Sequence, residues 1–231
     1  MKISAAMAVL FALVVVLVGV LCVEGRVPGE IIFYYFSQQW TGSRCGGERS
    51  CCYPKTGKPA PGFVIEGLRP QNLMNEDLKN CDPKDQLNPS KISDLTSELQ
   101  RYWPSLACPS RSNMRHWKNE WSTYGTCGNY VLNQTQYFKA ALNLKKEVNL
   151  LDVLIKGGIK PNGGSYDLYN ASETIRMAVG YMPGIFCVKD KAGKTLLNVI
   201  IGCTVDGTSY NDCPGMLGSD CGPSFKFPPL K

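Results

Sequence analysis

The stretch WKNEWSTYGTC, residues 117–127, combines a helix face, a turn and a terminal cysteine in one short segment. Trp117 and Trp121 are four residues apart, so a helix places both rings on the same face. That helix is predicted to run from about residue 113 to 124, and Gly125 then begins a turn. We therefore expect this segment to pack an aromatic face into a core and to be held at its end by a disulfide bond.

A second informative stretch, FVIEGLRP, occupies residues 63–70 and opens with three apolar residues typical of a strand. Gly67 and Pro70 are predicted to end this strand, since both residue types weaken a strand interior. A longer run rich in β-branched and aromatic residues, at 31–40, predicts the opening strand of the sheet.

Apolar residues spaced by three and four predict further helices at about 90–104, 134–151 and 172–182. Two more strands are predicted at 185–188 and 195–205, joined by a turn. Helices and strands do not alternate regularly along the chain. We therefore predict an α+β fold, with helices packed on a central, mostly antiparallel sheet.

The N-terminus has the features of a secretory signal peptide. Lys2 precedes an apolar run over 5–23, and Gly25 offers a small residue for cleavage. An N-terminal membrane anchor is the alternative, because the run is nearly long enough to span a bilayer. We expect a signal peptide at 1–25 and one domain at 26–231, with no membrane attachment after cleavage.

The charge of the chain is a weak guide to its partners. Its 231 residues carry a formal net charge of +6 at pH 7. The basic residues are spread along the sequence and form no cluster. A surface of this kind is compatible with a polyanionic partner but does not by itself indicate one.

Cysteine usage points to an oxidising compartment. Of 11 cysteines, Cys22 lies in the predicted signal peptide, and the other ten form an even set, as in a disulfide framework. Spacing alone does not select their pairing. The chain has a single histidine and no pair of short Cys-x-x-Cys knuckles, so we expect no metal or cofactor. Asn133 and Asn170 begin N-glycosylation sequons, which suits an exported protein.

Four segments, in this order and spacing, resemble the plant ribonuclease T2 family: Gln39-Trp40, SCCYP at 50–54, FVIEGLRP at 63–70 and WKNEWSTYGTC at 117–127. The resemblance covers essentially the whole mature chain. It implies the ribonuclease T2-like fold, with a cleft across a central antiparallel sheet. It also implies five disulfides: Cys45–Cys51, Cys52–Cys108, Cys81–Cys127, Cys187–Cys221 and Cys203–Cys213.

The resemblance also indicates what has changed in the site. Cleavage of RNA needs a base for the ribose 2′-hydroxyl, an acid for the leaving 5′ oxygen and a stabilising cation at the phosphate. The family's histidines correspond here to Glu66, Asn119 and Tyr124, and its lysine corresponds to Thr123, whereas Glu120 is retained. An amide does not titrate near neutral pH, and the pKa of tyrosine is about 10. We therefore predict a degenerate site and a protein that is not an enzyme.

Two other sources of acid–base chemistry lie near these positions. His116 precedes Glu120 by four residues, but the family carries a bulky apolar residue there, so we interpret His116 as a packing residue. Glu66 and Glu120 could form a carboxylate pair of the kind that hydrolyses glycosides. We favour instead a residual Glu120 beside a Glu66 that is neutralised by Arg69 or Arg115.

Ligand binding without cleavage is a further alternative. Gln39 matches a position that helps to hold a base in the plant enzymes, and Arg69, Arg115 and Lys118 leave positive charge near the cleft. Glu66 and the lack of a concentrated basic patch oppose strong binding of phosphates. Weak binding of RNA or a nucleotide therefore stays open.

These observations lead to an expectation about function. The family includes inactive plant members that accumulate as vegetative storage proteins, and this chain is similar in losing its histidines while keeping its disulfides. We predict an inactive ribonuclease T2 homologue that stores nitrogen in a plant storage organ, with no required partner. The secretory pathway would deliver it to the vacuole or the cell exterior. The alternative is a non-catalytic defence protein that binds RNA, a nucleotide or a protein partner.

Overall fold

The computed structural model describes residues 31, 33–46, 51–52, 61–109, 112–213 and 219–230. The predicted signal peptide at 1–25 and Tyr53-Pro54 of the second motif lie outside the described residues. In the part of the chain that is described, no helix is both long and apolar enough to cross a membrane.

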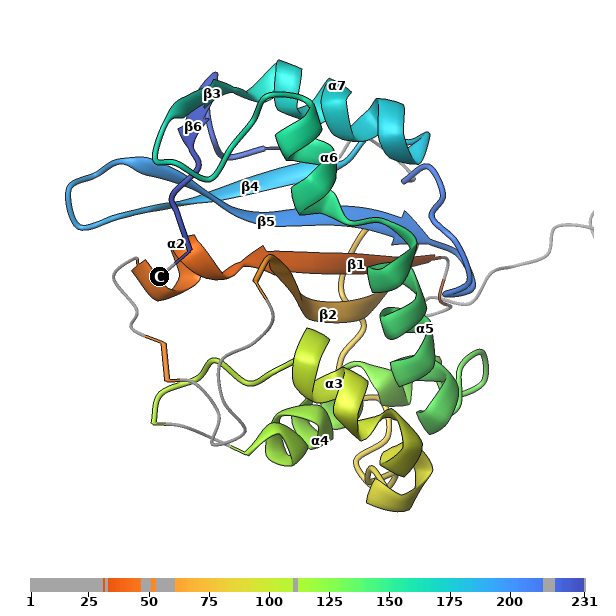
Figure 1. Cartoon of the computed structure of the whole chain (residues 1–231). Coiled ribbons are helices and arrows are strands. Elements are labelled where there is room, and N and C mark those ends of the chain that lie inside the picture. Colours follow the sequence, from red (N-terminus) through yellow and green to blue (C-terminus); the bar gives the residue numbers. More distant parts are fainter. Residues whose placement is uncertain are drawn as a thin grey trace, which may run out of the picture. The chain divides into compact units, whose positions relative to one another are not determined.

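A mainly antiparallel sheet lies at the centre of the described residues (Figure 1). β1 lies between β2 and β5, and β5 also pairs with β4. β6 joins β5 in parallel and pairs with β3 in antiparallel fashion. The strands are β1 (Phe33–Trp40), β2 (Phe63–Gln71), β3 (Ser165–Asp167), β4 (Gly184–Lys189), β5 (Thr195–Thr204) and β6 (Ser224–Lys226). This arrangement confirms the predicted α+β fold with a central antiparallel sheet.

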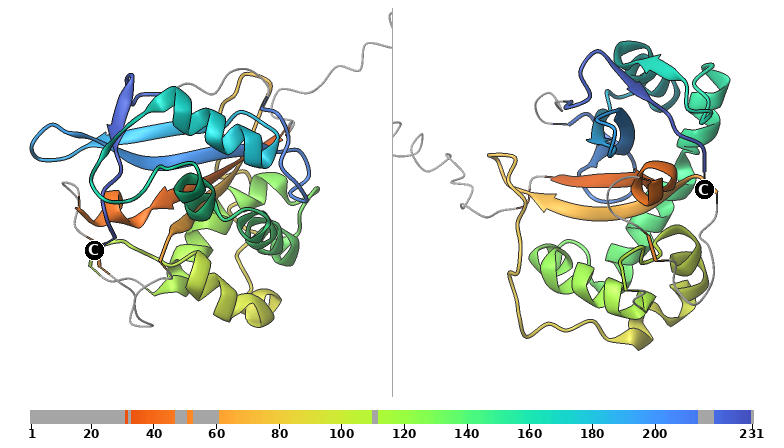
Figure 2. Two further views of the ribbon diagram at one scale, coloured as in Figure 1. Left: turned by 45° about the horizontal axis from the view of Figure 1, so that its top comes forward. Right: turned by 90° about the vertical axis from the view of Figure 1, so that its left-hand side faces the viewer.

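Helices pack on both sides of β1 and β2, as the right-hand view of Figure 2 shows. Helices α3, α4 and α5 form one buried core with β1 and β2, and α6 and α7 form a second with β4 and β5. The α-helices are α2 (Thr41–Gly46), α3 (Thr96–Tyr102), α4 (Asn113–Thr123), α5 (Gln134–Glu147), α6 (Leu150–Lys156) and α7 (Leu168–Val179). Short 3-10 helices occupy Pro89–Leu95 and Gly125–Gly128.

Strand β2 is longer than predicted, because it continues through Gly67 and Pro70 to Gln71. It lies at the edge of the sheet, where the missing N–H of Pro70 need not pair with a neighbour. A β-bulge interrupts its pairing with β1: Ser37 lies opposite Gly67 and Gln38 opposite Ile65, so Glu66 is the additional residue. A bulge of this kind redirects the side chains that follow it.

Three predicted helices also differ from the structure. The helix predicted at about 90–104 is a 3-10 helix over Pro89–Leu95 followed by α3, which ends at Tyr102. The predicted helix at 134–151 is divided, because Val148 has an extended backbone and the Asn149 side chain caps the N-terminus of α6. Helix α7 begins earlier than predicted, with Asp167 as its cap, and ends at Gly180, which has a φ of 84°. Local capping chemistry, rather than the apolar period, sets these ends.

Helix α4 matches its predicted range closely and packs as expected. Trp117 and Trp121 are both fully buried. A Cβ on Gly125 would lie 2.2 Å from the Trp121 ring, so only glycine fits at this turn. Cys127 is bonded to Cys81 directly after it.

Five disulfides tie these elements together, and they are the same pairs that the family resemblance implied. They are Cys45–Cys51, Cys52–Cys108, Cys81–Cys127, Cys187–Cys221 and Cys203–Cys213. Three of them join residues more than 30 positions apart, which restricts the unfolded chain most strongly.

Replacing Tyr137 by phenylalanine should lower the free energy of unfolding by about 1 kcal/mol. The buried Tyr137 hydroxyl donates a 2.7 Å hydrogen bond to the Leu68 carbonyl and so links α5 to β2. Denaturant unfolding with the disulfides intact measures the change. The matched control is Tyr169→Phe, because the Tyr169 side chain is 69% exposed, and it should change the stability by less than about 0.5 kcal/mol. Equal effects of the two variants would contradict the link.

Candidate functional site

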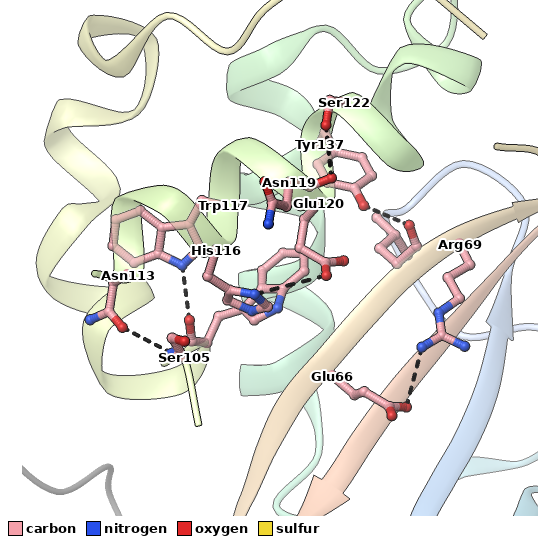
Figure 3. Close-up of polar contacts among 12 residues, drawn as sticks. Glu66, Arg69, Ser105, Asn113, His116, Trp117, Asn119, Glu120, Ser122 and Tyr137 are labelled. Atoms are coloured by element: carbon pink, nitrogen blue, oxygen red, sulfur yellow. Dashed lines mark hydrogen bonds and ion pairs between the residues drawn. The ribbon is translucent and has the colours of Figure 1, made fainter. Parts of the chain in front are cut away.

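A cleft of about 690 Å³ lies between β2 and α4 and continues over β5. Its volume falls in the range of pockets that hold a small-molecule ligand. Ile65, Glu66 and Arg69 line it from β2, and His116 and Glu120 line it from α4. Figure 3 shows His116 and Glu120 side by side on α4, with Arg69 and Glu66 on the strand opposite.

The bulge and the helical period together produce this arrangement. His116 and Glu120 are four residues apart on α4 and so share one face. Glu66 and Arg69 are three residues apart on β2, yet the bulge lets their side chains meet, with Arg69 Nη2 3.7 Å from Glu66 Oε2. A regular strand would send residues at this spacing to opposite faces. The site therefore depends on the one irregularity in the β1–β2 ladder.

Glu120 has an unusual environment for a carboxyl group. Its side chain is only 15% exposed, and its Oε2 has no hydrogen-bond partner among the described residues. Burial raises its pKa to about 7, the neighbouring Arg69 lowers it and Glu66 raises it further. Glu120 therefore changes charge near neutral pH, as a general acid or base must.

His116 lies beside Glu120, with its Nδ1 4.0 Å from Glu120 Oε1. Burial lowers the pKa of His116 to about 4. The imidazole is therefore neutral wherever Glu120 is ionised, and the two groups do not form an ion pair. The ring also meets Trp103 edge-on, with 6.4 Å between centroids. His116 therefore makes the predicted packing contact, and its side chain also lines the cleft.

Arg69 supplies a permanent positive charge to the cleft. Burial alone would lower the pKa of Arg69, but the neighbouring Glu66 and Tyr124 raise it overall. Its guanidinium lies 5.4 Å from the centre of the Tyr124 ring, in cation–π contact. The buried Nε of Arg69 has no hydrogen-bond partner among the described residues. Arg69 thus retains capacity to bind an anion.

The structure brings only some of the predicted site residues together. Glu66, Glu120 and Gln39 line the cleft. Asn119 and Thr123 do not line it: Asn119 is exposed, and the Thr123 carbonyl accepts a hydrogen bond from Asn80 N. Tyr124 contacts Arg69 without lining the cleft itself. Arg115 and Lys118, expected to add positive charge, also lie away from it.

Other residues of the cleft were not predicted from the sequence. Arg44 on α2, Lys189 at the end of β4 and Asn198 on β5 form the part that lies away from Glu120. Gln39 Nε2 lies 3.5 Å from Asn198 Oδ1 across the β1–β5 ladder. These residues come from distant segments with no shared motif, so only strand pairing could have revealed them.

Comparison with known proteins identifies the family to which this fold belongs. The model of the Ribonuclease T2 family matches residues 31–213, and the chain belongs to this family. The chain is 48% identical to the extracellular ribonuclease LE of Solanum lycopersicum, over 85% of this chain and 86% of that protein.

Solved structures of ribonucleases share the fold of this chain. A crystal structure of RNase NT in complex with 5′-AMP superimposes with a TM-score of 0.81 at 40% identity, and covers 87% of this chain and 99% of that one. A more distant relative, 28% identical over 76% of this chain and 72% of that protein, is the ribonuclease-like storage protein of Panax ginseng.

These relatives contradict the prediction that the chain is not an enzyme. The tomato relative carries the name of a ribonuclease, and RNase NT shares the fold at 40% identity and holds a nucleotide. With the motif histidines replaced, His116 was interpreted as a packing residue and Glu120 as a residual carboxylate. The cleft nevertheless contains Glu120, whose pKa is about 7, beside His116 and Arg69. The relatives therefore point to an enzyme.

Replacing Glu120 by glutamine should stabilise the fold at pH 8 but not at pH 5. The pKa of Glu120 is raised from 4.5 to about 7 in the folded state, so the folded protein binds this proton more tightly than the unfolded chain does. Its contribution to stability is present below pH 4.5 and is lost as pH rises through 7. The amide of glutamine does not ionise, so the variant does not lose this stability as pH rises.

Thermal unfolding of both proteins at pH 5 and pH 8 measures this difference. His116 is unchanged, so its own loss of stability between pH 6.5 and 4 is common to both proteins. Glu98→Gln is the control, because Glu98 forms an exposed ion pair with Lys146. A stability difference for Glu120→Gln that is the same at both pH values would contradict the assignment.

Proposed function

We propose that this chain acts on RNA in the cleft between β2 and α4, with Glu120 as the group that transfers the proton. The observation that carries this proposal is the position of Glu120: its carboxyl group faces Arg69, lies beside His116 and has a pKa of about 7. The tomato relative named as an extracellular ribonuclease supports the choice of substrate and reaction.

The reaction is transfer of a phosphodiester within RNA. The Glu120 carboxylate accepts the proton of the ribose 2′-hydroxyl while the 2′ oxygen attacks phosphorus. The bond between phosphorus and the 5′ oxygen breaks on the side opposite the attack, a water molecule protonates the leaving oxygen, and the Glu120 proton passes to solvent. The products are a 2′,3′-cyclic phosphate and a free 5′-hydroxyl. Glu120 thus serves as the general base, and water is the acid for the leaving oxygen.

Arg69 and His116 assist this step in different ways. Arg69 offers N–H donors to the phosphate oxygens, where negative charge builds up during attack. His116 is neutral at the pH where Glu120 ionises, so it provides a hydrogen-bonding imidazole without competing for the anion. Glu66 opposes phosphate binding, because its carboxylate already contacts Arg69 at 3.7 Å. The proposed reaction is therefore slower than one supported by two histidines, by about 10² to 10⁴ for each lost group.

Cleavage of a defined RNA oligonucleotide should rise as pH increases through about 7 and then level off, because the carboxylate of Glu120 is the active form. Glu120→Gln should lower the rate by about 10²-fold or more. His116→Ala should reduce the cleavage rate, and the midpoint of the pH profile should stay near 7. Purified protein assayed from pH 4 to 9, beside an active member of the family, provides the test.

Two controls make the cleavage experiment decisive. Glu98→Gln removes an exposed carboxylate far from the cleft and should leave the rate unchanged. Restoring the family's histidines, with Glu66→His, Asn119→His and Tyr124→His in one variant, tests whether the assay detects T2-type cleavage on this scaffold. Turnover in the restored variant together with none in the original chain would overturn the role assigned to Glu120.

Glu66→Gln should strengthen binding of 5′-AMP, because it removes the negative charge closest to Arg69. A partly exposed carboxylate of this kind, with the same sign of charge as the phosphate, alters affinity by a few-fold, and the gain should shrink at high salt. Isothermal titration at two ionic strengths measures both effects. Weaker binding by Glu66→Gln would show that Arg69 does not hold the phosphate.

A storage role in a plant storage organ is the second candidate, favoured by the similarity to the ginseng storage protein. Five disulfides suit a protein that must persist in a protease-rich compartment. The relative named as extracellular agrees with passage through the secretory pathway, which would deliver a storage protein to the vacuole or the cell exterior.

The abundance of the protein tests the storage role directly. Storage predicts that it is a major protein of the source tissue and that its level falls during sprouting. A scarce protein, or one whose level stays constant while reserves are mobilised, would contradict this role.

A further inference from the structure

The cleft extends well beyond Glu120 and Arg69, and its remaining part has a different charge. The described acidic residues that line it, Glu66 and Glu120, belong to β2 and α4. Arg44 and Lys189 line the part formed by α2, β4 and β5. Positive charge in this cleft is therefore concentrated away from the carboxylates, a feature that the proposed reaction does not use.

The segments that carry Arg44 and Lys189 both contact β5. Helix α2 follows β1 directly, and Ser43, next to Arg44, donates its buried hydroxyl to the Leu197 carbonyl. Lys189 pairs with Thr195 in the β4–β5 ladder, and its Nζ donates to Thr195 Oγ1. Thr195 and Leu197 are two residues apart on one strand, a distance of about 7 Å. The segments that carry Arg44 and Lys189 therefore contact β5 close together, and both side chains line the same cleft.

Two acidic side chains close to the end of β4 accept hydrogen bonds from other groups. Asp190 Oδ1 accepts hydrogen bonds from Ala192 N and Lys194 N within its own turn. Asp220 Oδ1 accepts from Cys187 N. Gln39 and Asn198 lie between the two charged regions and offer amide groups suited to the edge of a base. The cleft thus has cations at one end, amide groups in its middle and Arg69 at the other end.

We propose that Arg44 and Lys189 form a second phosphate-binding subsite, so that the preferred ligand is a stretch of single-stranded RNA with at least two phosphates. This inference rests on the proposed function, because Arg69 holds the phosphate that reacts. Anchoring a second phosphate at a distance compensates for the repulsion that Glu66 exerts on the first. The ligand is positioned by the β4–β5 end of the cleft and is cleaved at the α4 end.

Binding of 2′-O-methyl oligonucleotides tests the subsite, because they lack the hydroxyl that cleavage requires. The probes are 5′-AMP and 2′-O-methyl adenosine oligomers with two and three phosphates, measured by titration at several salt concentrations. Lys189→Gln and Arg44→Gln should each weaken binding of the three-phosphate probe about tenfold and leave 5′-AMP unchanged. Each should also reduce the slope of log affinity against log salt by about 0.7.

Lys191→Gln is the matched control, since Lys191 is exposed on the same β4–β5 turn but does not line the cleft. It should leave every probe unaffected. Lys189 is itself exposed, so Lys189→Gln retains the fold, and thermal unfolding verifies this. Equal losses for 5′-AMP and the longer probes, or no loss for either, would overturn the subsite.

The two proposals can fail separately. Normal RNA cleavage that depends on Glu120, with unchanged oligonucleotide binding in Lys189→Gln and Arg44→Gln, would remove the subsite and leave the reaction standing. Selective loss of long-probe affinity in those variants, with cleavage indifferent to Glu120→Gln, would keep the subsite and remove the reaction.

Discussion

The packing of Trp121 against Tyr137 and β2 is the contact on which the site depends. The Trp121 ring is fully buried, meets Tyr137 edge-on at 5.7 Å and donates its Nε1 hydrogen to the Asp85 carbonyl. Tyr137 in turn donates to the Leu68 carbonyl of β2. Three elements are thus fixed relative to one another, and the Cys81–Cys127 disulfide secures the end of this region. Glu120, which directly precedes Trp121 in α4, therefore faces Arg69 at a set position.

The chemistry of the cleft follows from burial more than from the residues in the motif. A carboxyl group in water ionises near pH 4, but the Glu120 side chain is only 15% exposed, and this burial raises its pKa to about 7. Its partner His116 is shifted in the opposite direction for the same reason, since burial disfavours whichever form is charged. A site that has lost the histidines of its family still contains a group that titrates near neutral pH.

Part of the fold could be predicted from the sequence. The Trp117 and Trp121 spacing predicted α4 and its buried face, and the even cysteine set predicted a covalent framework. The extent of β2 was wrong, because glycine and proline were taken to end a strand that lies at a sheet edge. The conclusion that the chain is not an enzyme was also wrong, because it rested on the residue types at the motif positions, which do not reveal how burial shifts a pKa.

The sequence by itself determined the elements of the fold, its family and the identity of the groups available to the cleft. These are local properties, since helix period, strand composition and motif spacing are written in consecutive residues. Only the tertiary structure decided which of those groups meet, because Arg44, Arg69, Glu120 and Lys189 come from four separate elements. It also decided their protonation, since a pKa depends on the solvent and charges that surround a side chain, and those are supplied by residues far away in the chain.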